Sequence, residues 1–173
     1  ISARGLLELF ESEGLFDWDL RACQHMIDAW FNVYCGVRNK MQDYQREAVE
    51  TGKVRDMFGR YRLIPEVHST QEHIKHAGLR QAANAPIQSG ASGIIKEAMK
   101  QLTPLIQYYN QCGYVYPIVQ IHDELMFEIH KEHWRRIAKE FKQIMENVVP
   151  LSVPVACDVE AGDTWGDMEE VEV

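Results

Sequence analysis

Paired cysteines and long hydrophobic runs are both missing from this sequence. Its four cysteines stand far apart and no Cys-x-x-Cys pair occurs, so neither a disulfide framework nor a cysteine-based zinc site is indicated. No run of apolar residues approaches the roughly 18 to 20 that a membrane-spanning helix needs. We therefore expect reduced thiols, an intracellular setting and no membrane partner.

Positive charge is scarce as well. Lysine and arginine number 18 against 26 aspartates and glutamates, which gives a net charge of −8. The sequence therefore lacks the basic field with which a repressor or a histone attracts nucleic acid. Acidic residues are nevertheless what a site for metal cations requires. With 173 residues and 46% hydrophobic content, the chain can form one domain or one piece of a larger one.

Helices are predicted over much of the first two thirds of the chain. Hydrophobic spacing predicts a short helix ending near Gly14 and a long amphipathic helix over 19–50. The stretch 53–65 reads as two short strands around a glycine turn. A further helical region over 70–109 is predicted to break at Pro86, because proline removes a helical hydrogen bond.

Strands are predicted after residue 113. The runs 114–121 and 125–129 favour β structure and are separated by a short turn, which predicts a hairpin. A helix is predicted over 132–149 and a strand over 153–160. Helices that alternate with antiparallel strands indicate the α+β fold class, with an antiparallel sheet packed against long helices.

The turn of the predicted hairpin has an unusual composition. Tight turns favour Asn-Gly, Asp-Gly or Gly-Gly because their backbone needs positive φ, yet this turn reads His122-Asp123-Glu124. Residues that depart from the usual composition of a turn, with no evident benefit to stability, indicate a candidate functional site. Two adjacent carboxylates on a rigid strand end, with Glu128 further along, suit a hard cation such as Mg²⁺. The alternative is a solvated acidic turn with His122 as a structural histidine.

A polar row and two arginines are candidates for binding nucleic acid. Arg80, Asn84 and Gln88 are spaced four apart and would share one face of a continuous helix. Such donors can contact the DNA minor groove, where acceptors lie at nearly the same places for every base pair. Arg60 and Arg62 flank a turn and can contact backbone phosphates. For all five residues, a solvated surface is the alternative.

Two histidine pairs share a spacing of three residues, His73 with His76 and His130 with His133. A zinc site needs three or four converging ligands and supporting hydrogen bonds. The pairs alone therefore predict no zinc site.

Three sequence segments together resemble motifs of the family A DNA polymerases, the DNA polymerase I family. The segments are Phe58-Gly59-Arg60-Tyr61-Arg62-Leu63-Ile64-Pro65, Arg80-Gln81-Ala82-Ala83-Asn84-Ala85-Pro86-Ile87-Gln88-Ser89-Gly90-Ala91 and Gln120-Ile121-His122-Asp123-Glu124-Leu125. They resemble, in this order, the family's Gly-Arg-Arg-Arg-x-x-Pro segment, its Arg-x-x-x-Asn-x-Pro-x-Gln-Gly segment and its third polymerase motif. The resemblance covers essentially all 173 residues, and the tail Gly162-Asp163-Thr164-Trp165 fits it too. Gly93 is a departure, because family members usually carry aspartate there.

This resemblance implies a DNA-directed DNA polymerase, which adds deoxynucleoside triphosphates to a primer 3′-hydroxyl by two-metal-ion nucleotidyl transfer. It implies that Asp123, supported by Glu124, binds two Mg²⁺ ions, for which Mn²⁺ can substitute. It also implies that His122 neighbours the primer terminus. The polar row then faces the primer–template DNA near the new base pair.

The resemblance also implies that the catalytic centre is incomplete in this chain. The family's other catalytic aspartate and its nucleotide-binding helix lie upstream of anything present here. We therefore expect residues 1–173 to be the C-terminal part of a polymerase domain, completed by the N-terminal portion of the same polymerase. Within it we expect a largely helical fingers-side part over about 1–85 and a palm part, with a palm-type sheet and the metal-binding hairpin, over about 86–173.

Two other functions fit the same residues, namely a catalytically silent DNA-binding or interaction module and a metal-dependent nuclease. A cytoplasmic or nucleoid-associated location is expected, with cellular, viral and organellar sources all open.

Overall fold

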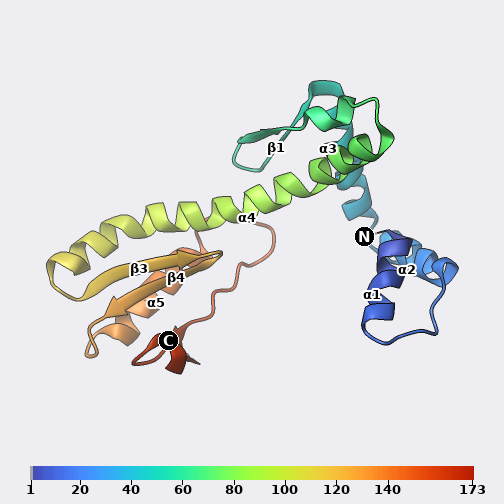
Figure 1. Ribbon diagram of the computed structural model, residues 1–173. Coiled ribbons are helices and arrows are strands. Elements are labelled where there is room, and N and C mark those ends of the chain that lie inside the picture. Colours follow the sequence, from blue (N-terminus) through green and yellow to red (C-terminus); the bar gives the residue numbers. More distant parts are fainter. Residues whose placement is uncertain (1) are drawn as a thin grey trace. The chain divides into compact units, whose positions relative to one another are not determined.

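The computed structural model describes residues 2–173, and these form two compact units (Figure 1). Unit 1 contains the described residues up to Arg55 together with Tyr61–Pro86, and unit 2 contains Asp56–Arg60 and Ile87–Val173. The described residues hold three two-stranded antiparallel sheets and several long helices, which confirms the predicted α+β class. No helix among residues 2–173 is both long and apolar enough to cross a membrane.

Unit 1 opens with three helices. They are α1 (Ala3–Ser12), α2 (Leu20–Val33) and α3 (Cys35–Thr51). The Asp19 side chain caps α2 by accepting a 2.6 Å hydrogen bond from the Ala22 N–H. The prediction of one helix over 19–50 is wrong, because the backbone leaves the helical region at Tyr34, with φ −103° and ψ 52°. The residues at this break include Val33, Tyr34 and Gly36, and all three have low helix propensity.

A short hairpin follows α3. Its strands β1 (Lys53–Arg55) and β2 (Tyr61–Leu63) are antiparallel, and the 3-10 helix η1 (Pro65–His68) leads on to α4. This confirms the predicted pair of strands around a glycine turn, where Gly59 has φ +81°. The buried core of unit 1 consists of Ala48, Val54, Ile64, Val67, Ala82 and Ala85.

Helix α4 (Glu72–Gln111) is continuous over 40 residues, so the predicted break at Pro86 is wrong. Proline lacks the N–H that would donate to the carbonyl of Ala82. Ala82 and Ala85 are nevertheless buried in the core of unit 1, and tertiary packing supplies most of the stability of a helix in a protein. The boundary between the two units falls inside this helix, after Pro86.

Unit 2 contains the main hairpin and the helix that follows it. The elements are β3 (Val115–Ile121), β4 (Glu124–Ile129) and α5 (Trp134–Glu146), which confirms the predicted hairpin and helix. The buried core consists of Leu102, Tyr109, Val115, Ile137 and Phe141, which come from α4, β3 and α5. Leu125, Phe127 and Ile129 alternate along β4 and pack on this core. The hairpin therefore turns one face to the two helices that run along it (Figure 1).

The chain has little regular structure after α5. Strand β5 (Glu160–Ala161) pairs with β6 (Glu169–Glu170), and the 3-10 helix η2 (Trp165–Asp167) lies between them. The predicted strand over 153–160 is therefore wrong except at its last residue. Pro154 has no N–H to donate to a ladder, and no strand in the described part of the chain pairs with residues 153–159.

Candidate functional site

The turn between β3 and β4 is formed by His122 and Asp123, because Ile121 pairs with Glu124. His122 has φ +53° and is the one non-glycine residue with positive φ among residues 2–173. Such a backbone costs roughly 1–2 kcal/mol for an L residue. The Gln120 side chain donates a 2.7 Å hydrogen bond to the His122 carbonyl and so supports the turn. A strained residue at a supported turn is typical of a functional site.

Asp123 and Glu124 are both exposed at this turn. None of the ion pairs within the described residues involves either carboxylate. Glu128 lies four residues beyond Glu124 on β4, which is about 13 Å at the usual rise of a strand. The turn thus offers two neighbouring carboxylates, and Glu128 is too far away to join them.

This pair of carboxylates fits part of a site for a hard divalent cation. Mg²⁺ takes oxygen ligands, and proteins commonly supply only one or two carboxylates to it while water and substrate phosphates complete the octahedron. Asp123 and Glu124 have the right donor atoms and are open to solvent. The turn could therefore hold Mg²⁺, or Mn²⁺, together with ligands from elsewhere.

The polar row predicted to contact DNA lies on α4. Arg80 and Asn84 belong to unit 1 and Gln88 belongs to unit 2, and all three side chains are exposed. Ala82 and Ala85 lie between them in sequence and are buried. The helix therefore buries its small residues here and leaves the predicted donors free to meet a ligand.

The two arginines predicted to contact phosphates have different surroundings. Arg62 is exposed on β2, and its guanidinium lies 3.4 Å from Oε1 of Gln81. Arg60 donates from Nε to the Asp56 carboxylate over 2.9 Å and from Nη2 to the Ser89 carbonyl over 2.8 Å. Its side chain keeps 41% of its surface exposed. Arg60 is thus fixed in place while one part of its guanidinium still faces solvent.

Asp56 is the centre of this cluster. Its side chain is 1% exposed, and besides Arg60 Nε it accepts a 2.5 Å hydrogen bond from the Ser89 hydroxyl. It also accepts hydrogen bonds of 2.9 Å from the backbone N–H groups of Phe58 and Arg60. Burial would raise the pKa of this carboxyl, but the hydrogen bonds outweigh burial and hold the pKa below its ordinary value.

Sequence reasoning missed Asp56, although a local signal was present. Aspartate side chains often accept hydrogen bonds from backbone N–H groups a few residues ahead, and they do so mainly at turns. Asp56 stands three residues before the turn glycine Gly59. That spacing marks a residue which organises the turn and, here, positions Arg60.

Gly93 stands where the family resemblance predicts an aspartate. A Cβ atom added here would overlap the ring of Phe58 and the guanidinium of Arg60. Both residues belong to unit 2 with Gly93. The glycine therefore gives the 56–60 turn room to pack on α4, and no larger side chain fits while that packing is kept.

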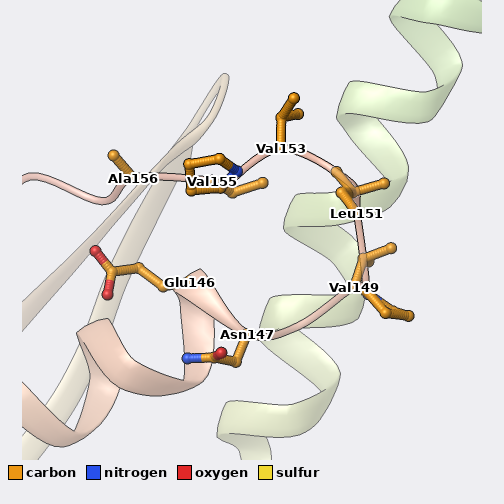
Figure 2. A pocket seen from close by; sticks show the side chains of 9 residues that line it. Glu146, Asn147, Val149, Leu151, Val153, Val155 and Ala156 are labelled. Carbon is orange, nitrogen blue, oxygen red and sulfur yellow. The ribbon is translucent and has the colours of Figure 1, made fainter.

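An open pocket of about 520 Å³ lies elsewhere in unit 2, between the end of α5 and the segment that follows (Figure 2). Glu146 and Asn147 line it together with apolar side chains of 149–156. None of the predicted site residues lines this pocket. This cavity is therefore distinct from the candidate site at the β3–β4 turn.

Likeness to a solved structure defines the class of protein, a polymerase domain or a part of one. The structure matches the polymerase domain of DNA polymerase I from M. smegmatis, solved with a DNA primer–template and a deoxynucleoside triphosphate, with a TM-score of 0.77 and 30% sequence identity. The match covers 88% of this chain and 26% of that one. The sequence model of DNA polymerase family A matches residues 11–167, and the chain belongs to this family.

Relatives with curated descriptions agree with this assignment. The chain is 36% identical to DNA polymerase I of Streptococcus pneumoniae over 140 residues, which is 80% of this chain and 16% of that protein. It is 32% identical to the thermostable DNA polymerase I of Thermus aquaticus, over 85% of this chain and 17% of that protein. DNA polymerase theta of Drosophila melanogaster is 32% identical over 98% of this chain and 8% of its own length. The chain thus spans between 8% and 17% of the length of these relatives.

A glycine substitution tests the packing of the 56–60 turn. Gly93→Ala should lower the free energy of unfolding by about 1–3 kcal/mol, because the methyl group overpacks the contact with Phe58 and Arg60. Gly90→Ala is the matched control on the same helix, since its Cβ would meet only Met57 atoms at 3.6 and 3.7 Å. The control should be neutral or stabilising by up to about 1 kcal/mol. Urea titrations of both variants make the comparison, and equal effects would contradict the packing described here.

The lowered pKa of Asp56 predicts a dependence of stability on acid pH. Because the pKa of the folded state lies below the ordinary value of 3.8, the charged carboxylate stabilises the fold above about pH 4. That contribution is lost as the pH falls through the folded-state pKa. Urea titrations at pH 7 and pH 3 should therefore show a larger loss of stability for the wild-type chain than for Asp56→Asn.

Asp163→Asn is the control for this experiment. The pKa of Asp163 is also lowered, by its hydrogen bond with Lys131, but the pair is exposed to solvent and such pairs contribute little. This variant should keep the acid sensitivity of the wild type. If Asp56→Asn keeps it as well, the Asp56 carboxylate does not stabilise the folded state.

Proposed function

We propose that this chain supplies one half of the catalytic centre of a DNA-directed DNA polymerase, together with contacts to the primer–template. The observation that supports this most directly is the pair of exposed carboxylates, Asp123 and Glu124, at a strained turn in a chain of DNA polymerase family A. The solved relative from M. smegmatis holds a primer–template and a deoxynucleoside triphosphate. By analogy, these are the proposed substrates of the present chain.

Asp123 and Glu124 would hold Mg²⁺, with Mn²⁺ as a substitute. When bound, two such ions supply an activated primer 3′-hydroxyl and neutralise charge on the triphosphate and the departing pyrophosphate. The chain's own contribution is to place the two carboxylates on a short, hydrogen-bonded turn, so that they need little reorganisation. His122 shares that turn and is proposed to neighbour the primer terminus.

The exposed donors of α4 supply the proposed DNA contacts. Arg80, Asn84 and Gln88 carry groups that can donate to minor-groove acceptors, which sit alike in all base pairs and so report the shape of a pair. Arg62 and the free part of Arg60 are suited to backbone phosphates. These contacts fix the register of the duplex, and catalysis of phosphoryl transfer depends mainly on such positioning and on charge neutralisation.

A second portion of the polymerase completes the proposed centre. The turn carries two adjacent acidic residues, and a two-metal site draws its ligands from more than one element. The proposed domain division, with a fingers-side part before about residue 86 and a palm part after it, leaves the remaining ligands and the nucleotide-binding groups to the N-terminal portion.

Reconstitution tests this function. The 173-residue chain alone should extend no primer, and extension should appear when the separately produced N-terminal portion is added. In the mixture, Asp123→Ala should reduce extension on the order of a thousandfold, because metal stabilisation of the transition state is worth several kcal/mol. Primer extension on a gel, with Mg²⁺ and all four nucleotides, is the measurement.

Asp17→Ala is the matched control, since Asp17 is exposed outside the helices of unit 1. It should leave extension unchanged, and circular dichroism should show both variants folded. Normal extension by Asp123→Ala would make the chain a silent DNA-binding module. Degradation of labelled DNA with Mg²⁺ in the absence of nucleotides would make it a nuclease.

A further inference from the structure

The connection between β4 and α5 brings three metal-binding side chains together. His130, Glu132 and His133 each offer one ligand atom, and these atoms all lie within 4.8 Å of one another. The β3–β4 turn lies at the opposite end of β4, about 20 Å away for a six-residue strand. The cluster is therefore separate from the proposed polymerase site.

The backbone of this connection is fixed at both ends. The His130 N–H donates to the Tyr114 carbonyl over 2.9 Å, at the open end of the hairpin. The His133 N–H donates to the His130 carbonyl over 2.9 Å, and the Ile137 N–H donates to the His133 carbonyl over 3.1 Å. The three side chains thus start from a turn that is bonded to the hairpin on one side and to α5 on the other.

The imidazole rings are also held by their neighbours. The Tyr114 ring lies against both, with centroids 4.3 Å from His133 and 5.8 Å from His130. The planes of the two imidazoles are inclined by 30°, with centroids 5.4 Å apart. Rings in contact with a common aromatic neighbour lose less rotational freedom when they bind an ion, which favours binding.

One hydrogen bond engages the imidazole of His130. The Glu132 N–H donates to His130 Nδ1 over 3.3 Å. The usual length of such a bond is about 2.9–3.0 Å, and this longer one is weak. An ion that binds Nδ1 in place of this hydrogen bond therefore displaces little.

Cations near the cluster are directed to other partners. The Lys131 ammonium pairs with Asp163 over 2.7 Å. The Arg135 guanidinium stacks on the Trp134 ring and donates to the Glu172 carbonyl. Arg136 lies over the Tyr109 ring. None of these three cations is committed to Glu132, and its carboxylate is available to a metal.

We propose that His130, Glu132 and His133 bind one Zn²⁺ ion, with water as the fourth ligand. Two imidazoles and one carboxylate form a ligand set that zinc uses widely. Ligands of a tetrahedral zinc ion stand about 3.3 Å apart, given bonds of about 2.0–2.1 Å. His130 and Glu132 are exposed and His133 is half-buried, and we propose that rotation of the exposed side chains brings the three ligand atoms to this distance. The bound ion would join the end of β4 to the start of α5.

Zinc binding to the full 173-residue chain tests this proposal. Competition with a chromophoric zinc chelator should give one tight site per chain. His130→Ala and Glu132→Gln should each weaken that site at least about tenfold, as the loss of groups around zinc commonly does. Glu132→Gln preserves the shape of an exposed side chain, so its effect does not depend on any change in folding. Cobalt substitution should give visible absorption bands in the wild type that both variants lose.

Two control variants locate the binding. His76→Ala removes one histidine of the exposed pair on α4, which lies 3.6 Å from Glu72, and Asp123→Ala removes a carboxylate of the β3–β4 turn. Both should bind zinc as the wild type does. A wild-type affinity no greater than that of His130→Ala overturns the proposal, and so does a loss of binding in either control. Zinc binding is independent of primer extension, so this result and the polymerase result can be told apart.

Discussion

The contact on which unit 2 depends is the packing of one hairpin face against two helices. Leu102, Val115 and Ile137 come from α4, β3 and α5, and each is fully buried. Burial of such side chains contributes about 1.5–3 kcal/mol each. The hairpin enters this core through Val115 of β3 and through Leu125, Phe127 and Ile129 of β4, while most of β3 is exposed. The acidic turn and the histidine connection thus lie at the two ends of the hairpin, where their side chains are accessible to a ligand.

Around Asp56, too, a buried group positions an exposed one. The carboxylate is buried and accepts several hydrogen bonds. One of these comes from Nε of Arg60 and holds that side chain in place, although 41% of its surface remains exposed. Asp56 also accepts hydrogen bonds from the Ser89 hydroxyl and from two backbone N–H groups, so the buried carboxylate does not depend on Arg60 alone. Gly93 belongs to this arrangement, because the space that a side chain would occupy is filled by Phe58 and Arg60. The departure from the family pattern at Gly93 therefore has a steric explanation.

Local patterns in the sequence were sufficient to predict the hairpins. They were insufficient to predict features that depend on contacts between residues far apart in the sequence. The β3–β4 hairpin was predictable because two β-favouring runs flank a short turn and Gly113 precedes them. The continuity of α4 through Pro86 was not, because it depends on alanines buried against residues far away in sequence. The carboxylates of the turn were found from a broken turn rule, whereas Asp56 was missed because its partner Ser89 lies 33 residues away. The histidine pair was seen, but its convergence with Glu132 depends on the course of one short connection.

The two ends of β4 differ in the hardness of their ligands, and this bears on which ions each would hold. The turn at Asp123 offers two adjacent carboxylates, which suit Mg²⁺ and Mn²⁺, beside the single imidazole of His122. The connection at His130 offers two imidazoles and one carboxylate, a set that Mg²⁺ disfavours and zinc prefers. The proposed zinc site lies about 20 Å along β4 from the acidic turn, and the two sets of ligands are expected to favour different ions.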